Sequence, residues 1–322
     1  MTETAKRKGA RDFRVTMMYH PSHHVLDLDE AERWFGHAFG RPSTSLASMR
    51  AGAPSREGYP SDYSTFTPIA DVFFDTIDPT RYVLLGVQRY PSIVEPHLKG
   101  FGWYIEGLAD LYCELRRRDI RVVSQLDELA DGNDPPTAAG SAMPLYFSLA
   151  EDVGLRYEFF PAIPFPIDPR TAPDWSLAPV SEDDPLGIEQ CSHHTVLTDR
   201  PDRALRLVVD VLGGEVVHEG HDEVRGTTGT CVKLGDSILE YAVPEPGTLA
   251  HADWLKEAPN DTYHAITWKV ADLDRAVRHL EVQGVVIEAF SDDTVVTQAA
   301  TSLGIPWGFT TRLKPGDPRA EG

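Results

Sequence analysis

Two adjacent histidines, His193 and His194, begin the apolar run SHHTVLTD at residues 192–199. A neutral imidazole can bind a metal ion through one ring nitrogen, and it exchanges a proton near neutral pH. Successive side chains of a strand point to opposite faces, so only one of the two histidines can face a given site. A structural role for both, as polar residues at the start of a strand, is the alternative.

Two glutamates stand in similarly apolar runs. Glu240 lies within ILEYAV at 238–243, and Glu158 lies between Tyr157 and Phe159. A carboxylate buried in such a strand is costly unless it is paired or binds a metal ion. Both glutamates are therefore candidate ligands, and exposure at the edge of a sheet is the alternative for each.

The elements that must position these residues form a repeated pattern of a strand followed by an amphipathic helix. The strands are expected at 14–26, 100–106, 192–198 and 263–270, and the helices at 27–40, 107–119, 199–214 and 271–285. Short apolar runs after each helix predict further strands, at 81–88, 154–160, 231–243 and 305–313. A single strand–helix–strands unit leaves one sheet face uncovered, so we expect the four units to work in pairs.

A proline-rich segment at 161–188 separates two halves of similar size, because prolines exclude helix interior and central strand. We predict an N-terminal tail at 1–11, a two-unit domain at 12–160, this linker, a second two-unit domain at 189–313 and a tail at 314–322. The turn-rich region 50–71 is expected to be a lid or a plain surface excursion.

Composition limits the classes of partner. The 322-residue chain has a formal net charge of −20 and a pI near 4.9. Such an acidic protein repels phosphates, which argues against nucleic acids and membrane surfaces as partners. Three scattered cysteines without CxxC spacing favour a reduced, cytoplasmic protein. We find neither a secretory signal nor a stretch apolar enough to span a membrane.

The pattern resembles the vicinal oxygen chelate superfamily, which includes glyoxalase I, methylmalonyl-CoA epimerase, fosfomycin-resistance proteins and type I extradiol dioxygenases. HPSHHVLDLDEA places His20 upstream of Asp27, where the family carries a ligand, and GLRYEFF and DSILEYAVP place Glu158 and Glu240 at ligand positions of closing strands. The resemblance covers about residues 13–160 and 189–312. It implies an α+β fold of four βαβββ modules, paired into two vicinal-oxygen-chelate domains, each an open β-cup with helices outside.

The resemblance also implies a ligand set for each half. In the second half this set is His193, Glu240 and, if a bulge at the start of its strand re-aims it, His264. Two histidines and one carboxylate suit Fe(II), and Mn, Ni, Co or Zn in other members. Gly308 stands where ring-cleaving dioxygenases supply their carboxylate.

In the first half, the ligand positions hold His20, an apolar residue near Leu85 or Gly86, Gly100 and Glu158. Only two of these four can bind a metal ion. Either half could be the active one. A glutamate beside the metal, or an unbound His24 or His194, is a candidate general base.

We therefore expect a divalent-metal-dependent enzyme that chelates vicinal oxygens of a small substrate, with an extradiol-type, ring-cleaving dioxygenase of a catechol as the first choice and Fe(II) as its metal. A glyoxalase- or epimerase-like isomerase or lyase acting on an enolisable carbonyl compound is the first alternative. A non-catalytic small-molecule-binding protein is the second. The sequence leaves a homodimer open.

Overall fold

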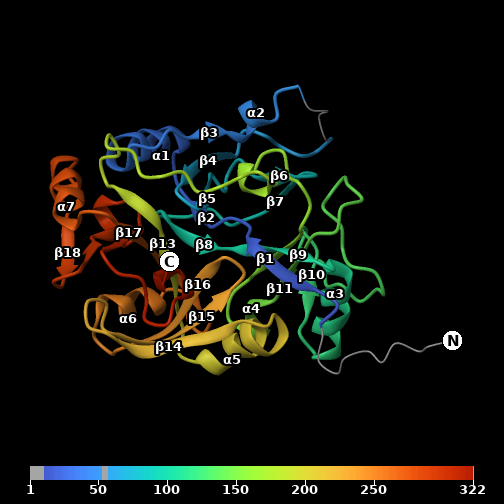
Figure 1. The fold of residues 1–322 in the computed structure, drawn as a ribbon. Helices are drawn as coiled ribbons and strands as arrows, with labels where there is room; N and C mark the ends of the chain where they lie inside the picture. The colour runs from blue at the N-terminus through green and yellow to red at the C-terminus, as the bar shows by residue number, and fades with distance from the viewer. Residues whose placement is uncertain (1–10, 53–56, 322) are drawn as a thin grey trace.

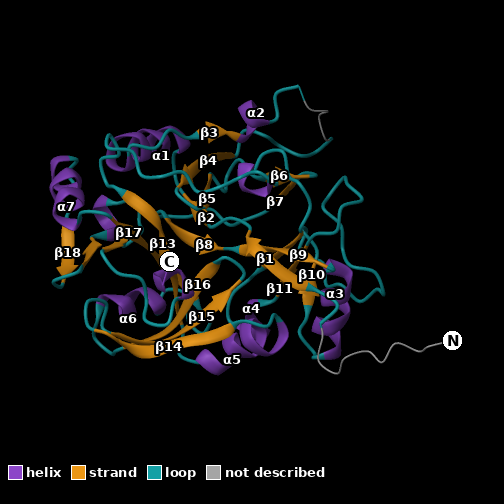
Figure 2. Ribbon diagram, in the orientation of Figure 1, coloured by secondary structure: helices purple, strands orange, loops and turns teal. Residues whose placement is uncertain are grey.

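The structure, a computed structural model, describes residues 11–52 and 57–321 (Figure 1). All of the predicted N-terminal tail except Arg11 lies outside the described residues. Sheets form the centre of the molecule and the longer helices lie on its outside (Figure 2). Within the described residues no helix has the length and apolar character that crossing a membrane requires.

The first half contains two five-stranded sheets. Its first module contains β1 (Arg14–Met18), β2 (Ser22–His24), α1 (Leu28–Trp34), a π-helical turn (Phe35–Phe39), β3 (Thr44–Ser45), α2 (Leu46–Met49), β4 (Ser64–Ile69) and β5 (Val72–Ile77). A ribbon of β6 (Val83–Leu84) and β7 (Val87–Gln88) follows. The second module contains β8 (His97–Gly100), β9 (Gly102–Glu106), α3 (Leu108–Arg117), β10 (Val122–Val123), β11 (Tyr146–Ser148), α4 (Ala150–Val153) and β12 (Glu158–Pro161).

The second half forms one eight-stranded sheet. Its first module contains β13 (Ile188–Leu197), α5 (Pro201–Leu205), a π-helical turn (Arg206–Val211), β14 (Glu215–Asp222), β15 (Thr227–Leu234), β16 (Ser237–Pro244) and α6 (Leu249–Trp254). Its second module contains β17 (Thr262–Val270), α7 (Leu273–Val282), β18 (Ile287–Phe290), β19 (Thr294–Thr297) and β20 (Gly308–Thr310). Short 3-10 turns lie at Pro169–Thr171, Ala299–Thr301 and Pro318–Glu321.

The four modules share one strand order. The first strand of each pairs in parallel with its last strand: β2 with β5, β9 with β12, β13 with β16 and β17 with β20. The first strands also pair with each other in antiparallel fashion, β1 with β9 and β2 with β8 in the first half, and β13 with β17 in the second. The predicted α+β class and its four paired βαβββ modules are confirmed.

Aspartate side chains cap the starts of α1 and α7, whereas α3 and α5 begin without a side-chain cap. The side chain of Asp27 accepts hydrogen bonds from the backbone N–H groups of Asp29 and Glu30 and so caps α1. Asp272 caps α7 in the same way, through the N–H of Arg275. Gly40 ends the first helical segment with a φ of 64°, a left-handed conformation that glycine adopts without strain.

One predicted strand lies elsewhere in the chain. The closing strand of the first module is β5 (Val72–Ile77), and not the run at 81–88, which forms the β6–β7 ribbon. The prediction of a ligand position near Leu85 or Gly86 is therefore wrong. The region 50–71 likewise contains β4, a buried strand paired with β5 along its whole length. The strand β4 was not recognised because its sequence, STFTPI, contains only two large apolar residues, Phe66 and Ile69, and its Ser and Thr side chains are buried.

Aromatic side chains pack the two halves together. The ring of Phe39, at the end of the first helical segment, lies 5.1 Å from the ring of Trp307 and 6.4 Å from that of Trp268. All three side chains are fully buried. Such pairs combine a large buried apolar area with favourable ring geometry, so the halves share one core.

Acid should destabilise this shared core through buried His194, whose Nδ1 lies 2.6 Å from the hydroxyl of Tyr263. Burial lowers the pKa of His194 from 6.5 to about 3. The unfolded chain therefore takes up a proton first as the pH falls, and the stability present above pH 6.5 is lost between 6.5 and 3. The contribution of His194 to the free energy of unfolding therefore falls by about 2 kcal/mol between pH 7.5 and pH 5.

Urea unfolding at pH 7.5 and at pH 5 measures this contribution of His194 to the free energy of unfolding. We expect the loss of unfolding free energy to be about 2 kcal/mol smaller in His194→Gln than in the wild type. The exposed His37→Gln serves as the control, with an unchanged pH dependence. An equal loss in His194→Gln and the wild type would contradict the account.

Candidate functional site

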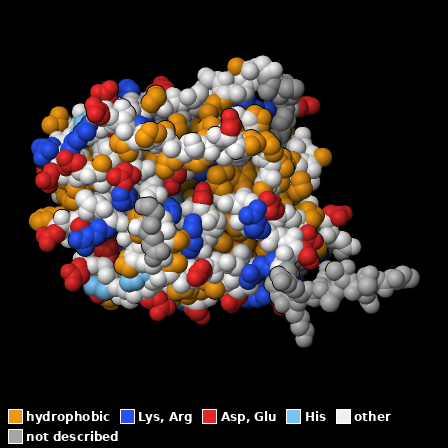
Figure 3. Space-filling model, viewed as in Figure 1, with side chains coloured by type: hydrophobic (Ala, Val, Ile, Leu, Met, Phe, Trp, Pro, Cys, Tyr) orange, Lys and Arg blue, Asp and Glu red, His pale blue; other side chains and the backbone are white. Residues whose placement is uncertain are grey.

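A cavity of about 290 Å³ lies in the first half, where strands of both modules meet. Most of its wall is apolar or aromatic, and part of it comes from Phe165, Pro166 and Ile167 of the proline-rich segment. Hydrophobic side chains also gather on the face of the molecule shown in Figure 3, over its upper part. A largely apolar cavity with a few converging polar groups is the usual form of a small-molecule site.

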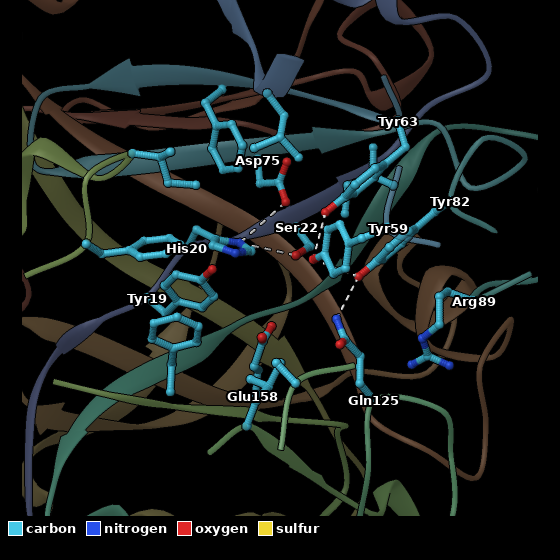
Figure 4. A pocket seen from close by; sticks show the side chains of 18 of the residues that line it. Tyr19, His20, Ser22, Tyr59, Tyr63, Asp75, Tyr82, Arg89, Gln125 and Glu158 are labelled. Atoms are coloured by element: carbon cyan, nitrogen blue, oxygen red, sulfur yellow. Dashed lines mark hydrogen bonds and ion pairs between the residues drawn. The ribbon is translucent and has the colours of Figure 1, made fainter. Parts of the chain in front are cut away.

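One histidine and two carboxyl groups face this cavity, which Arg50 and Arg89 also line (Figure 4). His20 lies in the kink between β1 and β2, Asp75 lies on β5 and Glu158 begins β12. The two carboxyl groups thus lie on the last strands of the two modules, and His20 comes just before the first strand, β2, of the first module. The remaining first strand, β9, begins with Gly102, where an added Cβ atom would lie 2.2 Å from the carbonyl oxygen of Glu158.

His20 and Asp75 are neighbours, whereas Glu158 points towards them from the opposite wall (Figure 4). The Nδ1 atom of His20 lies 3.7 Å from an oxygen of Asp75 and 3.4 Å from the hydroxyl of Ser22. The other Asp75 oxygen, Oδ1, is buried and has no hydrogen-bond partner among the described residues. The site thus holds a buried acceptor with unused capacity.

Burial shifts all three groups towards their neutral forms. It raises the pKa of Asp75 to about 8 and that of Glu158 to about 7, the latter against the opposing effect of Arg156 and Arg89. It lowers the pKa of His20 to about 3, helped by Arg170. The contact between His20 and Asp75 is therefore one between neutral groups at pH 7, and not an ion pair.

A wall of tyrosines bounds the cavity on one side. The rings of Tyr63 and Tyr82 stack at 3.9 Å with an angle of 3° between their planes. The hydroxyl of Tyr59 lies 3.4 Å from the hydroxyls of both. Gln125 donates a hydrogen bond of 2.9 Å to the Tyr82 hydroxyl. These contacts give a flat, rigid surface against which a planar ligand can lie.

A buried ion pair supports the kink that carries His20. Arg170, from the proline-rich segment, pairs with Asp168 at 2.7 Å and also donates to the carbonyl oxygens of Met18 and Tyr19. Tyr104 donates a further hydrogen bond to Asp168. The segment is thus part of the site, because it both lines the cavity and fixes the backbone immediately before His20.

The second half brings two of its three predicted ligands together. His193 and Glu240 lie 3.6 Å apart, on adjacent strands. Glu240, however, is already paired: its oxygens accept hydrogen bonds from Lys314 at 2.6 Å and from Thr195 at 3.0 Å. Burial raises the pKa of Glu240, but these contacts outweigh burial and hold that pKa below its ordinary value.

His264 lies at a register shift, as the proposed bulge requires. Thr195 pairs with Ala265 and Val196 pairs with Tyr263, so His264 is the extra residue between them. Its Nδ1 atom lies 2.7 Å from a carboxylate oxygen of Asp253. His264 therefore has a carboxylate partner of its own.

The two candidate general bases lie outside the cavity wall. The ring of His24 packs against the rings of Tyr90 and His97, at 4.5 and 5.6 Å. The two nitrogens of His194 meet the Tyr263 hydroxyl and the sulfur of Cys191, at 2.6 and 3.4 Å. Strand alternation explains the position of His194, because one of two adjacent histidines in a strand must turn to the opposite face. His24 has the same strand parity as Ser22, which lines the cavity, but its ring packs against Tyr90 and His97 and does not line the cavity itself.

Sequence reasoning missed Asp75 and the tyrosine wall. Asp75 is the single charged residue of the run VFFDTI at 72–77. Asp75, like Glu240, is a carboxylate within an apolar strand, and it could have been singled out on the same ground. The tyrosines lie in the region 50–71 and beside the β6–β7 ribbon, where no periodic pattern pointed to a shared surface.

Loss of the Arg170 guanidinium should destabilise the site, because it would leave the Asp168 carboxylate buried without its cation. We expect Arg170→Met to lower the free energy of unfolding in urea by about 3–5 kcal/mol. Adding Asp168→Asn should recover part of this loss. Arg14→Gln, which breaks an exposed pair with Glu106, should cost less than about 1 kcal/mol. A similarly small loss in Arg170→Met would show that the pair does not support the kink.

Comparisons with known proteins give matches at the level of structure. No protein-family model matches the sequence, and a search of curated proteins gives no match. The structure is similar to that of the Mn(II)-bound glyoxalase from Novosphingobium aromaticivorans, with a TM-score of 0.57 and 13% identity over 95% of this chain and 85% of that chain.

Two further solved structures match over nearly the full length of both chains. The 2,3-dioxygenase LapB from Pseudomonas sp. KL28 has a TM-score of 0.56 and 12% identity, over 95% of each chain. A mutant of 4-hydroxymandelate synthase from Streptomyces coelicolor has a TM-score of 0.58 and 13% identity, over 94% of this chain and 95% of that one. Together with the shared strand order of its four modules, these similarities show that the chain has the vicinal oxygen chelate fold.

Proposed function

We propose that the protein is a divalent-metal-dependent enzyme whose active site is the cavity of the first half, with His20, Asp75 and Glu158 as the metal ligands. The observation that carries the proposal is the convergence on one cavity of buried His20 and Asp75 with half-buried Glu158 from β12. The names of two similar structures, a Mn(II)-bound glyoxalase and a 2,3-dioxygenase, support an enzyme of this general kind.

The residues of the cavity fit a divalent cation by their chemistry. Asp75 Oδ1 is a buried acceptor without a partner among the described residues, and burial, together with the nearby Glu158 carboxylate, raises the pKa of Asp75 to about 8. A cation between Asp75 and Glu158 would replace the protons that both carboxyl groups otherwise retain. Within the described part of the chain, no three His, Cys, Asp or Glu side chains are grouped closely enough to hold one ion. Binding therefore requires Glu158 and the other two side chains to draw together.

The donor set favours one subclass over another. Two histidines with one carboxylate are typical of Fe(II) oxygenases, whereas one histidine with two carboxylates offers harder donors that suit ions such as Mn(II). We therefore favour an isomerase or lyase acting on an enolisable carbonyl compound over a ring-cleaving dioxygenase. A bound ion would polarise the substrate oxygen and stabilise the charge that develops there.

The protein's own residues supply the proton transfer and the positioning. The Glu158 carboxylate faces the cavity and is the candidate to accept a proton from carbon and return it to the neighbouring atom. The Tyr63–Tyr82 stack would hold the flat, conjugated part of the substrate. Tyr19 and Phe160, whose rings stack at 4.6 Å, would add an apolar wall beside the substrate.

A non-catalytic binding protein is the second candidate. The observation that favours it is the separation of Glu158 from His20 and Asp75, since a metal-free cavity needs no closer approach. The aromatic wall would then bind a planar compound through stacking and apolar contact. The two candidates differ in whether ligand binding depends on a metal ion.

Metal binding tests the first candidate. Isothermal titration of chelator-treated protein with Mn(II) should give one equivalent in the wild type. Single His20→Gln, Asp75→Asn and Glu158→Gln variants should each weaken binding by about tenfold or more, because each removes one ligand of three. The exposed Glu106→Gln should bind like the wild type. Wild-type protein that binds planar aromatic compounds but no Mn(II) would favour the second candidate.

The same titration should depend on pH in a defined direction. Burial raises the pKa values of Asp75 and Glu158 to about 8 and 7, so both carboxyl groups hold protons at pH 6 that a cation must displace. Mn(II) affinity should therefore rise by about tenfold per pH unit for each displaced proton between pH 6 and 8. An affinity independent of pH over this range would contradict the assignment of these two ligands.

A further inference from the structure

The second half contains a cup of the same design, and its centre is filled by a side chain of the protein's own C-terminal segment. Lys314 follows the last strand, β20, in a stretch that the sequence predicts to be a tail. Its ammonium lies 2.6 Å from an oxygen of Glu240 and 3.7 Å from an oxygen of Asp222. Glu240 is on β16 and Asp222 ends β14.

His193 completes the group around this ammonium. Its Nε2 atom lies 3.6 Å from the second oxygen of Glu240, is buried and has no hydrogen-bond partner among the residues described. Its Nδ1 atom is held by the hydroxyl of Ser192 at 3.0 Å. An imidazole nitrogen without a partner and two carboxylates thus surround a cation that comes from within the chain.

We propose that Lys314 takes the place of a divalent cation in the second half, and that the C-terminal segment thereby keeps this half free of metal. The ligand pattern implied by the fold places a metal ion at His193 and Glu240, and the residues present do not leave room for one. A buried carboxylate needs a compensating charge, and the lysine already supplies it at hydrogen-bond distance.

The C-terminal segment is fixed at several points, so Lys314 is held in place and not merely adjacent. The guanidinium of Arg319 donates to the carbonyl oxygens of Cys191 and Ser192, at 3.1 and 2.9 Å, directly before His193. Gly316 has a φ of 74°, and an added Cβ atom there would lie 2.3 Å from the carbonyl oxygen of Val217. The segment therefore closes the cup as an ordered plug.

A second arginine closes the other side of the cup. Arg225 is buried and donates to the carbonyl oxygen of Pro306 at 3.1 Å and to the hydroxyl of Thr267 at 3.4 Å. An added Cβ atom at Gly308 would lie 2.9 Å from its guanidinium. The position where ring-cleaving relatives would carry a third ligand is thus covered by a cation. With Arg225 and Lys314, the two carboxylates of this cup are neutralised without a metal ion.

The test is the number of Co(II) ions bound, measured by the visible absorption of the bound ion in a His20→Gln/Glu158→Gln background, which removes the proposed first-half site. In this background we expect no bound Co(II). Lys314→Met, which keeps the length of the side chain but removes its charge, should add one equivalent. Lys314→Arg, which keeps a cation, should add none. The added equivalent should disappear when Glu240→Gln is combined with Lys314→Met.

Thermal unfolding covers the case in which Lys314→Met folds poorly. With chelator present, Lys314→Met should melt at a lower temperature than its parent, because Glu240 is left buried without a cation. Co(II) should restore its melting temperature, and Glu240→Gln should restore it without Co(II). The proposal is overturned if the parent already binds Co(II) at His193 and Glu240. It is equally overturned if Lys314→Met is as stable as its parent in chelator and gains no ion. Neither outcome depends on metal binding in the first half.

Discussion

A carboxylate buried in an open β-cup requires a cation or a proton, and the architecture of this protein follows from how each half meets that requirement. The strand order brings the first and last strands of paired modules together, and their inward side chains meet at the centre of each cup. In the second half a lysine neutralises Glu240 at 2.6 Å. In the first half no lysine or arginine among the described residues forms an ion pair with Asp75 or Glu158, and burial raises the pKa of both, for Glu158 against the opposing effect of Arg156 and Arg89.

This difference separates two cups that share one design. The second is closed by Arg225 and by a C-terminal segment tied to the backbone at Cys191 and Ser192. The first retains a cavity of about 290 Å³ and lines it with aromatic side chains. The proline-rich segment belongs with the first cup, since Phe165 lines its cavity and Arg170 holds the kink beside His20. The open cup can therefore receive a ligand, whereas in the closed cup the chain's own cations occupy the position beside Glu240.

The sequence predicts most of the fold because its signals are local. Helix starts at Asp27 and Asp272, the helix end at Gly40 and the strand–helix register are set by a few neighbouring residues. The first module's last strand, β5, escaped prediction because it is buried along its whole length, which removes the polar alternation that marks a half-buried strand.

The site was only partly predictable, since its decisive contacts join distant residues. Glu158, His193 and Glu240 could be singled out as polar residues in apolar strands, and His20 through the resemblance to the vicinal oxygen chelate superfamily. Nothing in the sequence pairs Glu240 with Lys314, because the two are brought together only by a segment folding back after the last strand. Asp75, like Glu240, is a carboxylate within an apolar strand, but its strand was not among those expected from the sequence. The second carboxyl group of the first-half cavity was therefore not predicted.

The most direct measurement of the central claim is the anomalous diffraction of crystals grown with Mn(II), which locates the ion without reference to activity. The account predicts one strong peak in the first half, within ligand distance of His20, Asp75 and Glu158, with these side chains drawn closer together than in the metal-free protein. A peak between His193 and Glu240, or no peak in the cavity at saturating Mn(II), would contradict it.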